Sequence, residues 1–93
     1  MAFDDHSRPC FARGVRIQTD ASTGEPMLLF PEGVLYLSPT ADDILRRCDG
    51  QTPVTTIVSS LAEEYDVSTE ALRTDVLDCL EDLYQRKLVV CSP

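Results

Sequence analysis

Apolar and polar residues form three short runs in the first third of the chain, separated by turn-forming residues. The runs are residues 13–18 (RGVRIQ), 26–30 (PMLLF) and 34–37 (VLYL). The first has the period of two that is typical of a half-buried strand, and the other two are short apolar runs between turn signals. The intervening DASTG and PEG segments contain residues that favour tight reversals of the chain. The pattern predicts a three-stranded antiparallel meander.

From Ser38 onward the apolar residues recur at steps of three and four, which predicts helices. Ser38 before Pro39 is a favourable helix start, Thr52 before Pro53 repeats it, and Ser68 caps a third helix. The Asp-Gly pair after the first helix is a typical helix end. The apolar positions are, helix by helix, Ala41, Ile44, Leu45 and Cys48; Val54, Ile57, Val58, Leu61 and Tyr65; and Leu72, Val76, Leu77, Cys79, Leu80, Leu83 and Tyr84.

Three strands followed by three helices predict an α+β domain whose helices cover one side of a small antiparallel sheet. Two consecutive helices after a short capped turn also give a helix-turn-helix outline, so we expect a winged helix-turn-helix-like fold. The 93 residues suffice for one modest core. We expect residues 13–93 to form this domain and residues 1–12 to be a flexible leader. Residues 88–90 (LVV) predict either a short closing strand or a packed tail.

The sequence offers little for metal binding or catalysis. The four cysteines include no C-x-x-C pair, and the one histidine, His6, lies in the predicted leader. We therefore expect no metal site, no cofactor and no Ser-His-Asp or Cys-His catalytic arrangement, and hence no enzyme. No apolar run approaches the ~20 residues that cross a bilayer. The N-terminus also lacks a secretion signal, which predicts a cytoplasmic protein without membrane contact.

The formal net charge is −8, and most of it lies in the second half of the chain. Residues 1–48 have five basic and seven acidic side chains, whereas residues 49–93 have three and nine. DNA binding requires clustered Lys and Arg residues. The charged residues in and just after the third helix are three cations, Arg73, Arg86 and Lys87, and five anions, Glu70, Asp75, Asp78, Glu81 and Asp82. We therefore expect no nucleic acid partner.

The run VLYL is apolar on both faces of its predicted strand, although the chain has few helices to cover a second face. One interpretation is that one face packs on the helices while Leu35 or Tyr36 is simply a tolerated exposed residue. The other is that this is an exposed edge strand, to which an incoming peptide adds as a fourth strand. The residues alone leave both interpretations open.

The third helix has an apolar sector of roughly 160°, wider than the ~100° of an ordinary surface helix. This width predicts that the helix contacts the core and a second neighbour. Arg73 falls inside the sector. It either extends its stem across apolar surface with its head in water, or lies at a groove where its planar guanidinium holds an acidic residue or a carbonyl of a ligand.

Four segments together resemble the coenzyme PQQ (pyrroloquinoline quinone) synthesis protein D family, the founding type of precursor-peptide recognition domains. They are ARGVRIQTD (12–20), LLFPEGVLYLSPTADDILRRCDG (28–50), TTIVSSLAEEY (55–65) and DVLDCLEDL (75–83). The most specific feature is the order PEG, VLYL, SPTA, IL and CDG. The chain departs from the family at Ser38, where Asn is frequent, and at Lys87, where Gly is common. Both are helix-end positions and leave the binding interpretation standing.

The resemblance implies a non-enzymatic carrier of the PQQ precursor peptide. Family members present this peptide to a radical S-adenosylmethionine (radical SAM) enzyme, which crosslinks a Glu and a Tyr of the precursor. In related domains the peptide lies as an added strand against the third strand, beside the third helix. Carried over to this sequence, the peptide-binding residues are Val34, Leu35, Tyr36 and Leu37 on the strand, and Leu72, Arg73, Val76 and Leu80 on the helix.

Three further possibilities remain beside the carrier. One is a winged-helix regulator that reads DNA, which the acidic third helix disfavours. A second is a binder of PQQ or of an intermediate, for which we would expect clustered cations around an aromatic slot; the sequence shows no such cluster. Edge strands also permit pairing or exchange between two copies, so a homodimer is conceivable.

Overall fold

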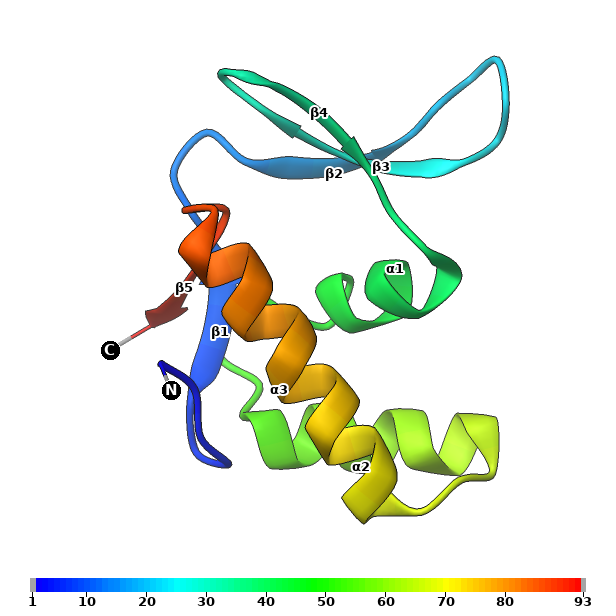
Figure 1. The fold of residues 1–93 in the computed structure, drawn as a ribbon, viewed down its shortest axis with the longest axis vertical. Coiled ribbons are helices and arrows are strands. Elements are labelled where there is room, and N and C mark those ends of the chain that lie inside the picture. The colour runs from blue at the N-terminus through cyan, green and yellow to red at the C-terminus, as the bar shows by residue number, and fades with distance from the viewer. Residues whose placement is uncertain (1, 93) are drawn as a thin grey trace.

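The computed structural model describes residues 2–92. The elements, in chain order, are β1 (Arg8–Phe11), β2 (Arg16–Thr19), β3 (Pro26–Phe30), β4 (Gly33–Tyr36), α1 (Pro39–Leu45), α2 (Val54–Tyr65), α3 (Thr69–Gln85) and β5 (Val89–Ser92). Strands β2, β3 and β4 form one antiparallel sheet in that order, and β1 pairs with β5 in a second. In Figure 1 the three-stranded sheet is a layer above the three helices. The α+β expectation is confirmed.

The three-stranded sheet is formed by the three segments that the sequence predicted as strands. Its register aligns Ile17 with Leu28 and Leu28 with Leu35, so these three side chains share the face that packs on the helices. Leu28, on the central strand, is fully buried. Because side chains alternate between the two faces of a sheet, residues 27 and 29 of the same strand point away from the core.

Helix starts follow the capping signals closely for α1 and α3. The Ser38 hydroxyl accepts a hydrogen bond from the Ala41 N–H at 3.1 Å, and the Ser68 hydroxyl accepts one from the Ala71 N–H at 3.3 Å. Helix α2 differs because its N-cap is Pro53, which has no side-chain acceptor. The helices enclose an apolar core in which Ile57, Val76 and Leu80 are fully buried.

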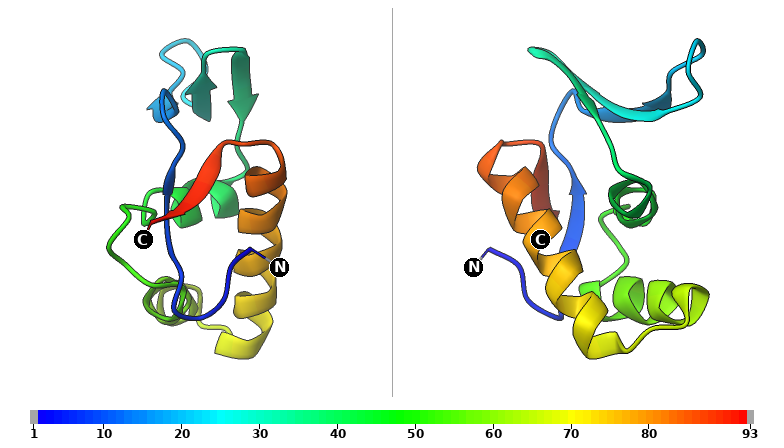
Figure 2. Two further views of the ribbon diagram at one scale, coloured as in Figure 1. Left: turned by 90° about the vertical axis from the view of Figure 1, so that its left-hand side faces the viewer. Right: turned by 45° about the vertical axis from the view of Figure 1, so that its right-hand side comes forward.

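The expected flexible leader is corrected by the structure. Residues 8–11 form β1, which pairs with β5 from Arg8↔Ser92 to Phe11↔Val89, so the LVV segment closes as a strand. Phe3 is only 3% exposed and packs its ring edge-on against Tyr84 of α3, with 5.8 Å between centroids. The N-terminal segment lies beside α3 (Figure 2). The ordered domain therefore includes residues 2–12, and this segment supplies the second neighbour that the wide apolar sector of α3 predicted.

The four cysteines are free thiols that differ in burial. Burial raises the pKa of Cys48 to about 12 and that of Cys79 to about 11. Cys91 is exposed. We expect iodoacetamide at pH 8 to label Cys91 at least roughly a hundredfold faster than Cys48 or Cys79, since the thiolate is the reactive form. Mass spectrometry of peptides measures the rates, and denatured protein is the control; equal rates in the native protein would contradict this assignment.

Candidate functional site

Strand β4 is the edge of the three-stranded sheet, with β3 as its one neighbour among residues 2–92. The Leu37 N–H donates to the Pro26 carbonyl oxygen at 3.0 Å, which fixes the hydrogen-bonding pattern along the β3–β4 ladder. Antiparallel strands alternate between hydrogen-bonded and non-hydrogen-bonded pairs. The backbone groups of Leu35 therefore point to β3, whereas those of Val34 and Tyr36 point to the free side of the sheet. We call this free side the β4 edge.

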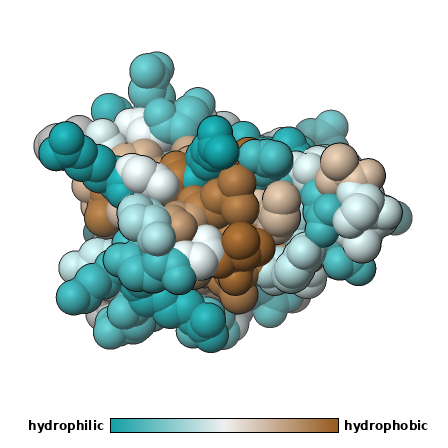
Figure 3. Space-filling view, turned by 90° about the horizontal axis from the view of Figure 1, so that it is seen from above, coloured by the Kyte–Doolittle hydropathy of each residue, from teal (hydrophilic) through white to brown (hydrophobic). Residues whose placement is uncertain are grey.

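The side chains of β4 and of Leu37, which directly follows it, explain why VLYL is apolar on both faces. Leu35 and Leu37 are half-buried and pack against the core. Val34 and Tyr36 point the other way and are 49% and 54% exposed. On that outer face the register places them beside residues 29 and 27 of β3, respectively. The four residues Met27, Leu29, Val34 and Tyr36 form the outer patch, and brown atoms occupy the middle of this face in Figure 3.

The sequences PMLLF and VLYL predict the outer patch only when the register of the two strands is known. Both faces of residues 34–37 were predicted to belong to the site, whereas Met27 and Leu29 were not. The signal that identifies them is the alternation within residues 26–30: once Leu28 is placed in the core, its two neighbours must face outward. The exposed β4 is thus part of a broader apolar surface.

Tyr36 is held across the sheet by the turn that follows β2. Its hydroxyl donates to Asp20 Oδ2 at 2.8 Å, while the Ser22 hydroxyl and N–H donate to Oδ1 at 2.7 and 2.9 Å. These bonds lower the pKa of Asp20 to about 2, with the Ser22 hydroxyl as the largest cause. The bond to Asp20 also raises the pKa of the Tyr36 phenol. The turn thereby fixes the ring at the end of the outer patch.

Acid should release this turn. Because the folded-state pKa of Asp20 lies below its ordinary 3.8, the stability it contributes is present above that value and is lost as the pH falls through about 2. We expect the Asp20 carboxyl carbon to titrate with a midpoint near 2 in an NMR titration. In the Asp20→Asn variant, the pKa of Tyr36 should fall toward the ordinary tyrosine value of 10, because the Asp20 carboxylate is the largest cause of its increase. A carboxyl midpoint near 3.8 would contradict the hydrogen-bonding pattern.

The predicted site residues of α3 do not all lie at the β4 edge. Leu72, Val76 and Leu80 are buried at 4%, 0% and 0% exposure, so their side chains hold α3 in the core. Leu35 and Leu37 pack against that same core. These three side chains therefore belong to the same apolar core as Leu35 and Leu37, and their direct contact with a peptide stays a prediction.

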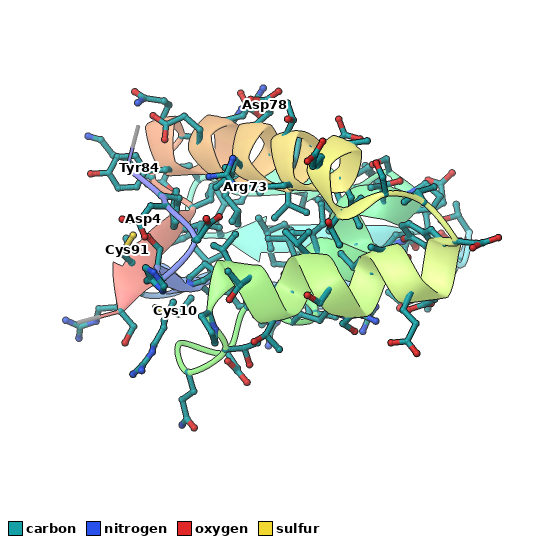
Figure 4. All side chains as sticks on the ribbon, turned by 90° about the horizontal axis from the view of Figure 1, so that it is seen from below. Asp4, Cys10, Arg73, Asp78, Tyr84 and Cys91 are labelled. Atoms are coloured by element: carbon teal, nitrogen blue, oxygen red, sulfur yellow. The ribbon has the colours of Figure 1, made fainter. Side chains whose placement is uncertain are left out.

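Arg73 lies at the other end of the molecule. Its Nε donates to Asp5 Oδ1 at 2.6 Å, and it lines a cavity of about 230 Å³ with residues of the first turns of α2 and α3. Figure 4 shows Arg73 beside the N-terminal segment, and Figure 1 shows the first turns of α3 next to α2, away from the sheet. The sequence predicted one groove that contains both Val34 and Arg73. In the structure Arg73 lies away from β4 and pairs with Asp5 of the same chain.

Other functional chemistry is sparse in the part of the chain that the structure describes. Within residues 2–92 no group of three or more His, Cys, Asp or Glu side chains is placed to hold a metal ion. His6 is exposed and donates its N–H to Asp4 in a local turn. None of the helices in this range is both long and apolar enough to span a membrane.

Comparison with known proteins identifies one family. The family model for coenzyme PQQ synthesis protein D (PqqD) matches residues 25–89. The chain is 33% identical over 84 residues to a PqqA binding protein of Xanthomonas euvesicatoria pv. vesicatoria, covering 90% of this chain and 91% of that protein. It is 35% identical over 83 residues to a PqqA binding protein of Rhodopseudomonas palustris, covering 89% of this chain and 81% of that protein.

Two solved structures are similar in fold. The solution NMR structure of the PqqD truncation of Methylobacterium extorquens PqqCD superposes with a TM-score of 0.82 and 31% identity, covering 95% of this chain and 94% of that chain. That protein is described as a functional, stand-alone recognition element for ribosomally synthesized and post-translationally modified peptides (RiPPs). The crystal structure of PqqD from Xanthomonas campestris gives a TM-score of 0.56 at 34% identity, covering 80% of this chain and 82% of that chain.

Proposed function

Because this chain belongs to the coenzyme PQQ synthesis protein D (PqqD) family, we propose that it is a non-catalytic recognition element that binds the PQQ precursor peptide, PqqA. The names of the relatives, which are PqqA binding proteins, and the described role of the Methylobacterium domain support this function. The β4 edge supports a binding mode in which the peptide adds as a fourth strand. The observation that carries this mode is that Val34 and Tyr36 expose both their backbone groups and their apolar side chains.

The free edge at β2 is a poorer docking site than the one at β4. The Asp20 N–H donates to the Glu25 carbonyl oxygen, and hydrogen-bonded pairs alternate with non-hydrogen-bonded pairs along antiparallel strands. The backbone groups of Ile17 and Thr19 therefore point to the free side of β2. The outward side chains next to them, Arg16 and Gln18, are however polar and exposed. Charged and polar residues on an edge strand discourage pairing. We therefore place the peptide at β4.

Backbone hydrogen bonds alone are too weak to hold the peptide. Val34 and Tyr36 offer two N–H donors and two carbonyl acceptors, and each bond contributes ~0.5–1.5 kcal/mol net. Their total of about 2–6 kcal/mol is comparable to the ~4 kcal/mol or more that association costs. Apolar side chains of the peptide must therefore supply affinity. The peptide's apolar side chains would pack beside the outer patch on one face of the sheet. On the other face they would pack beside Leu35 and Leu37.

We also propose that the bound peptide is handed to the radical SAM enzyme of PQQ biosynthesis. Strand addition leaves the remainder of a peptide free on either side of four paired residues, which suits delivery to a second protein. Size-exclusion chromatography of this protein with that enzyme, with and without PqqA, tests the partnership. Failure to form any complex in the presence of peptide would remove this step while leaving peptide binding intact.

An NMR titration tests the proposed function directly. Synthetic PqqA is added to the ¹⁵N-labelled protein, and the amide signals of residues 34–37 are followed. We expect the largest shifts at Val34 and Tyr36, because their N–H groups gain acceptors. The amide of Arg73 is the internal comparison, since it lies near α2 and should shift little. Shifts confined to the α2–α3 cavity would overturn the β4 assignment, and no binding at all would overturn the function.

A further inference from the structure

A basic pocket lies beside the turn that leads into β4. It is a cavity of about 340 Å³ whose cationic rim is formed by Arg13, Arg86 and Lys87 and whose apolar wall includes Phe30 and Leu88. These residues come from the β1–β2 loop, the end of β3, and the link between α3 and β5. The sequence showed no cationic cluster because Arg13 lies more than 70 residues before the adjacent pair Arg86 and Lys87. The fold alone brings them together.

The turns that build the basic pocket are held tightly. After α3 the Lys87 N–H donates to the Tyr84 carbonyl and the Leu88 N–H donates to the Leu83 carbonyl, both at 2.9 Å. This pair of hydrogen bonds forms a Schellman cap. On the opposite wall, Gly14 has a φ of +80°, and a Cβ placed there would lie 3.3 Å from Pro31 Cγ. The β1–β2 loop is therefore packed against the β3–β4 turn.

Lys87 occupies a backbone conformation that favours glycine. Its φ is +64°, at the position after the helix where a left-handed residue is needed. Among residues 2–92 the other non-glycine with positive φ is Asp66, and aspartate tolerates this region better than lysine does. A strained residue points to a use for its side chain. Here the use would be a positive charge at the rim of the basic pocket.

The pocket keeps its positive character despite nearby acids. Arg86 Nε lies 3.3 Å from Asp82 Oδ2, but the two side chains are 55% and 61% exposed, and such surface pairs are weak. Glu32 is also part of the lining. Arg13 and Lys87 form no ion pair with any residue in the range 2–92. In a protein of net charge −8, the pocket is a local concentration of positive charge.

We propose that the basic pocket binds the carboxylate of an Asp or Glu side chain of the docked peptide, at a position just C-terminal to its paired strand. This inference rests on the proposed function. The rest of the sheet is antiparallel, and antiparallel pairing is the more stable arrangement. A strand added antiparallel to β4 runs with its carboxyl end toward Gly33, next to Glu32 of the pocket lining. The apolar wall accommodates the stem of the acidic residue while Arg13 and Lys87 contact its head.

The test compares PqqA affinity among charge variants by calorimetry. We expect the Arg13→Gln/Lys87→Gln double variant to bind roughly fivefold more weakly than wild type and with a flatter dependence on salt. Arg8→Gln is the matched control, because Arg8 is an exposed cation on β1 that does not line the pocket. Its affinity should change less than about twofold. Single Asp or Glu residues of the peptide are also replaced by Asn or Gln. We expect one of these replacements to weaken binding to the wild-type protein by the same roughly fivefold factor and to leave binding to the double variant unchanged.

Each other outcome overturns the inference. Unchanged affinity and salt dependence in the double variant, with the shifts at Val34 and Tyr36 retained, removes the carboxylate subsite and leaves the proposed function standing. Loss of affinity on amidating the peptide's C-terminus assigns the pocket to the terminal carboxylate instead. Binding of PQQ itself to the pocket, without any effect of the peptide's acidic residues, makes it a quinone site. Absence of peptide binding removes both proposals.

Discussion

Replacing Val34 by proline is expected to weaken PqqA binding by about tenfold or more while the domain stays folded. Proline removes an N–H that points to the β4 edge, and its ring projects toward the incoming strand. Folding should survive because this N–H does not bond to β3, and edge positions tolerate proline. Calorimetry with PqqA measures the affinity, and circular dichroism checks the fold.

Thr19→Pro is the matched control for this variant. The Thr19 N–H points to the free side of β2, the opposite edge of the same sheet, and its side chain is also exposed. The two variants thus make the same backbone change at the two edges. We expect Thr19→Pro to bind PqqA within about twofold of wild type. Equal loss in both variants would show that proline acts by loosening the sheet, and loss in Thr19→Pro alone would move the peptide to β2.

Phe3→Ala is expected to destabilise the protein by about 3–5 kcal/mol, the usual range for truncating a buried phenylalanine. The ring is 3% exposed and lies edge-on against Tyr84, so its loss leaves a cavity between the N-terminal segment and α3. For a domain of this size, the melting temperature should fall by roughly 10 °C or more. Thermal unfolding followed by circular dichroism gives the midpoint.

Val67→Ala provides the comparison for Phe3→Ala. Val67 is a large apolar residue that is 47% exposed in the turn between α2 and α3, so its truncation should change the free energy of unfolding by less than about 0.5 kcal/mol. A Phe3→Ala protein as stable as Val67→Ala would mean that residues 2–7 contribute nothing to the fold. The sequence-based expectation of a flexible leader would then be correct after all.

Local signals predicted most of the elements. The capping serines Ser38 and Ser68 marked the starts of α1 and α3. Alternation marked the first strand of the larger sheet, and short apolar runs between turn signals marked the other two. These features depend on residues a few positions apart, where propensity and hydrogen bonding are local. The same signals predicted a strand at residues 34–37, which the structure shows at Gly33–Tyr36, and identified its two apolar faces.

Long-range contacts were not predictable in the same way. Pairing of β1 with β5 joins Phe11 to Val89, and no local pattern records such a partner. The helical period predicted that Arg73 lies inside the apolar sector of α3, but the period does not say which neighbour covers that side. The structure shows Asp5 there. The basic pocket likewise depends on three turns that meet only in the folded chain.

The Cys91 thiol donates to the Ala2 carbonyl oxygen at 3.3 Å, so the two ends of the described chain lie side by side, away from the sheet that contains β4 (Figure 1). A fusion partner or surface tether joined at either end would therefore project from the same corner of the molecule. The Methylobacterium domain, a truncation of PqqCD, shows that this fold occurs as part of a larger polypeptide. Immobilisation through residue 92 should accordingly leave Val34 and Tyr36 open to solvent.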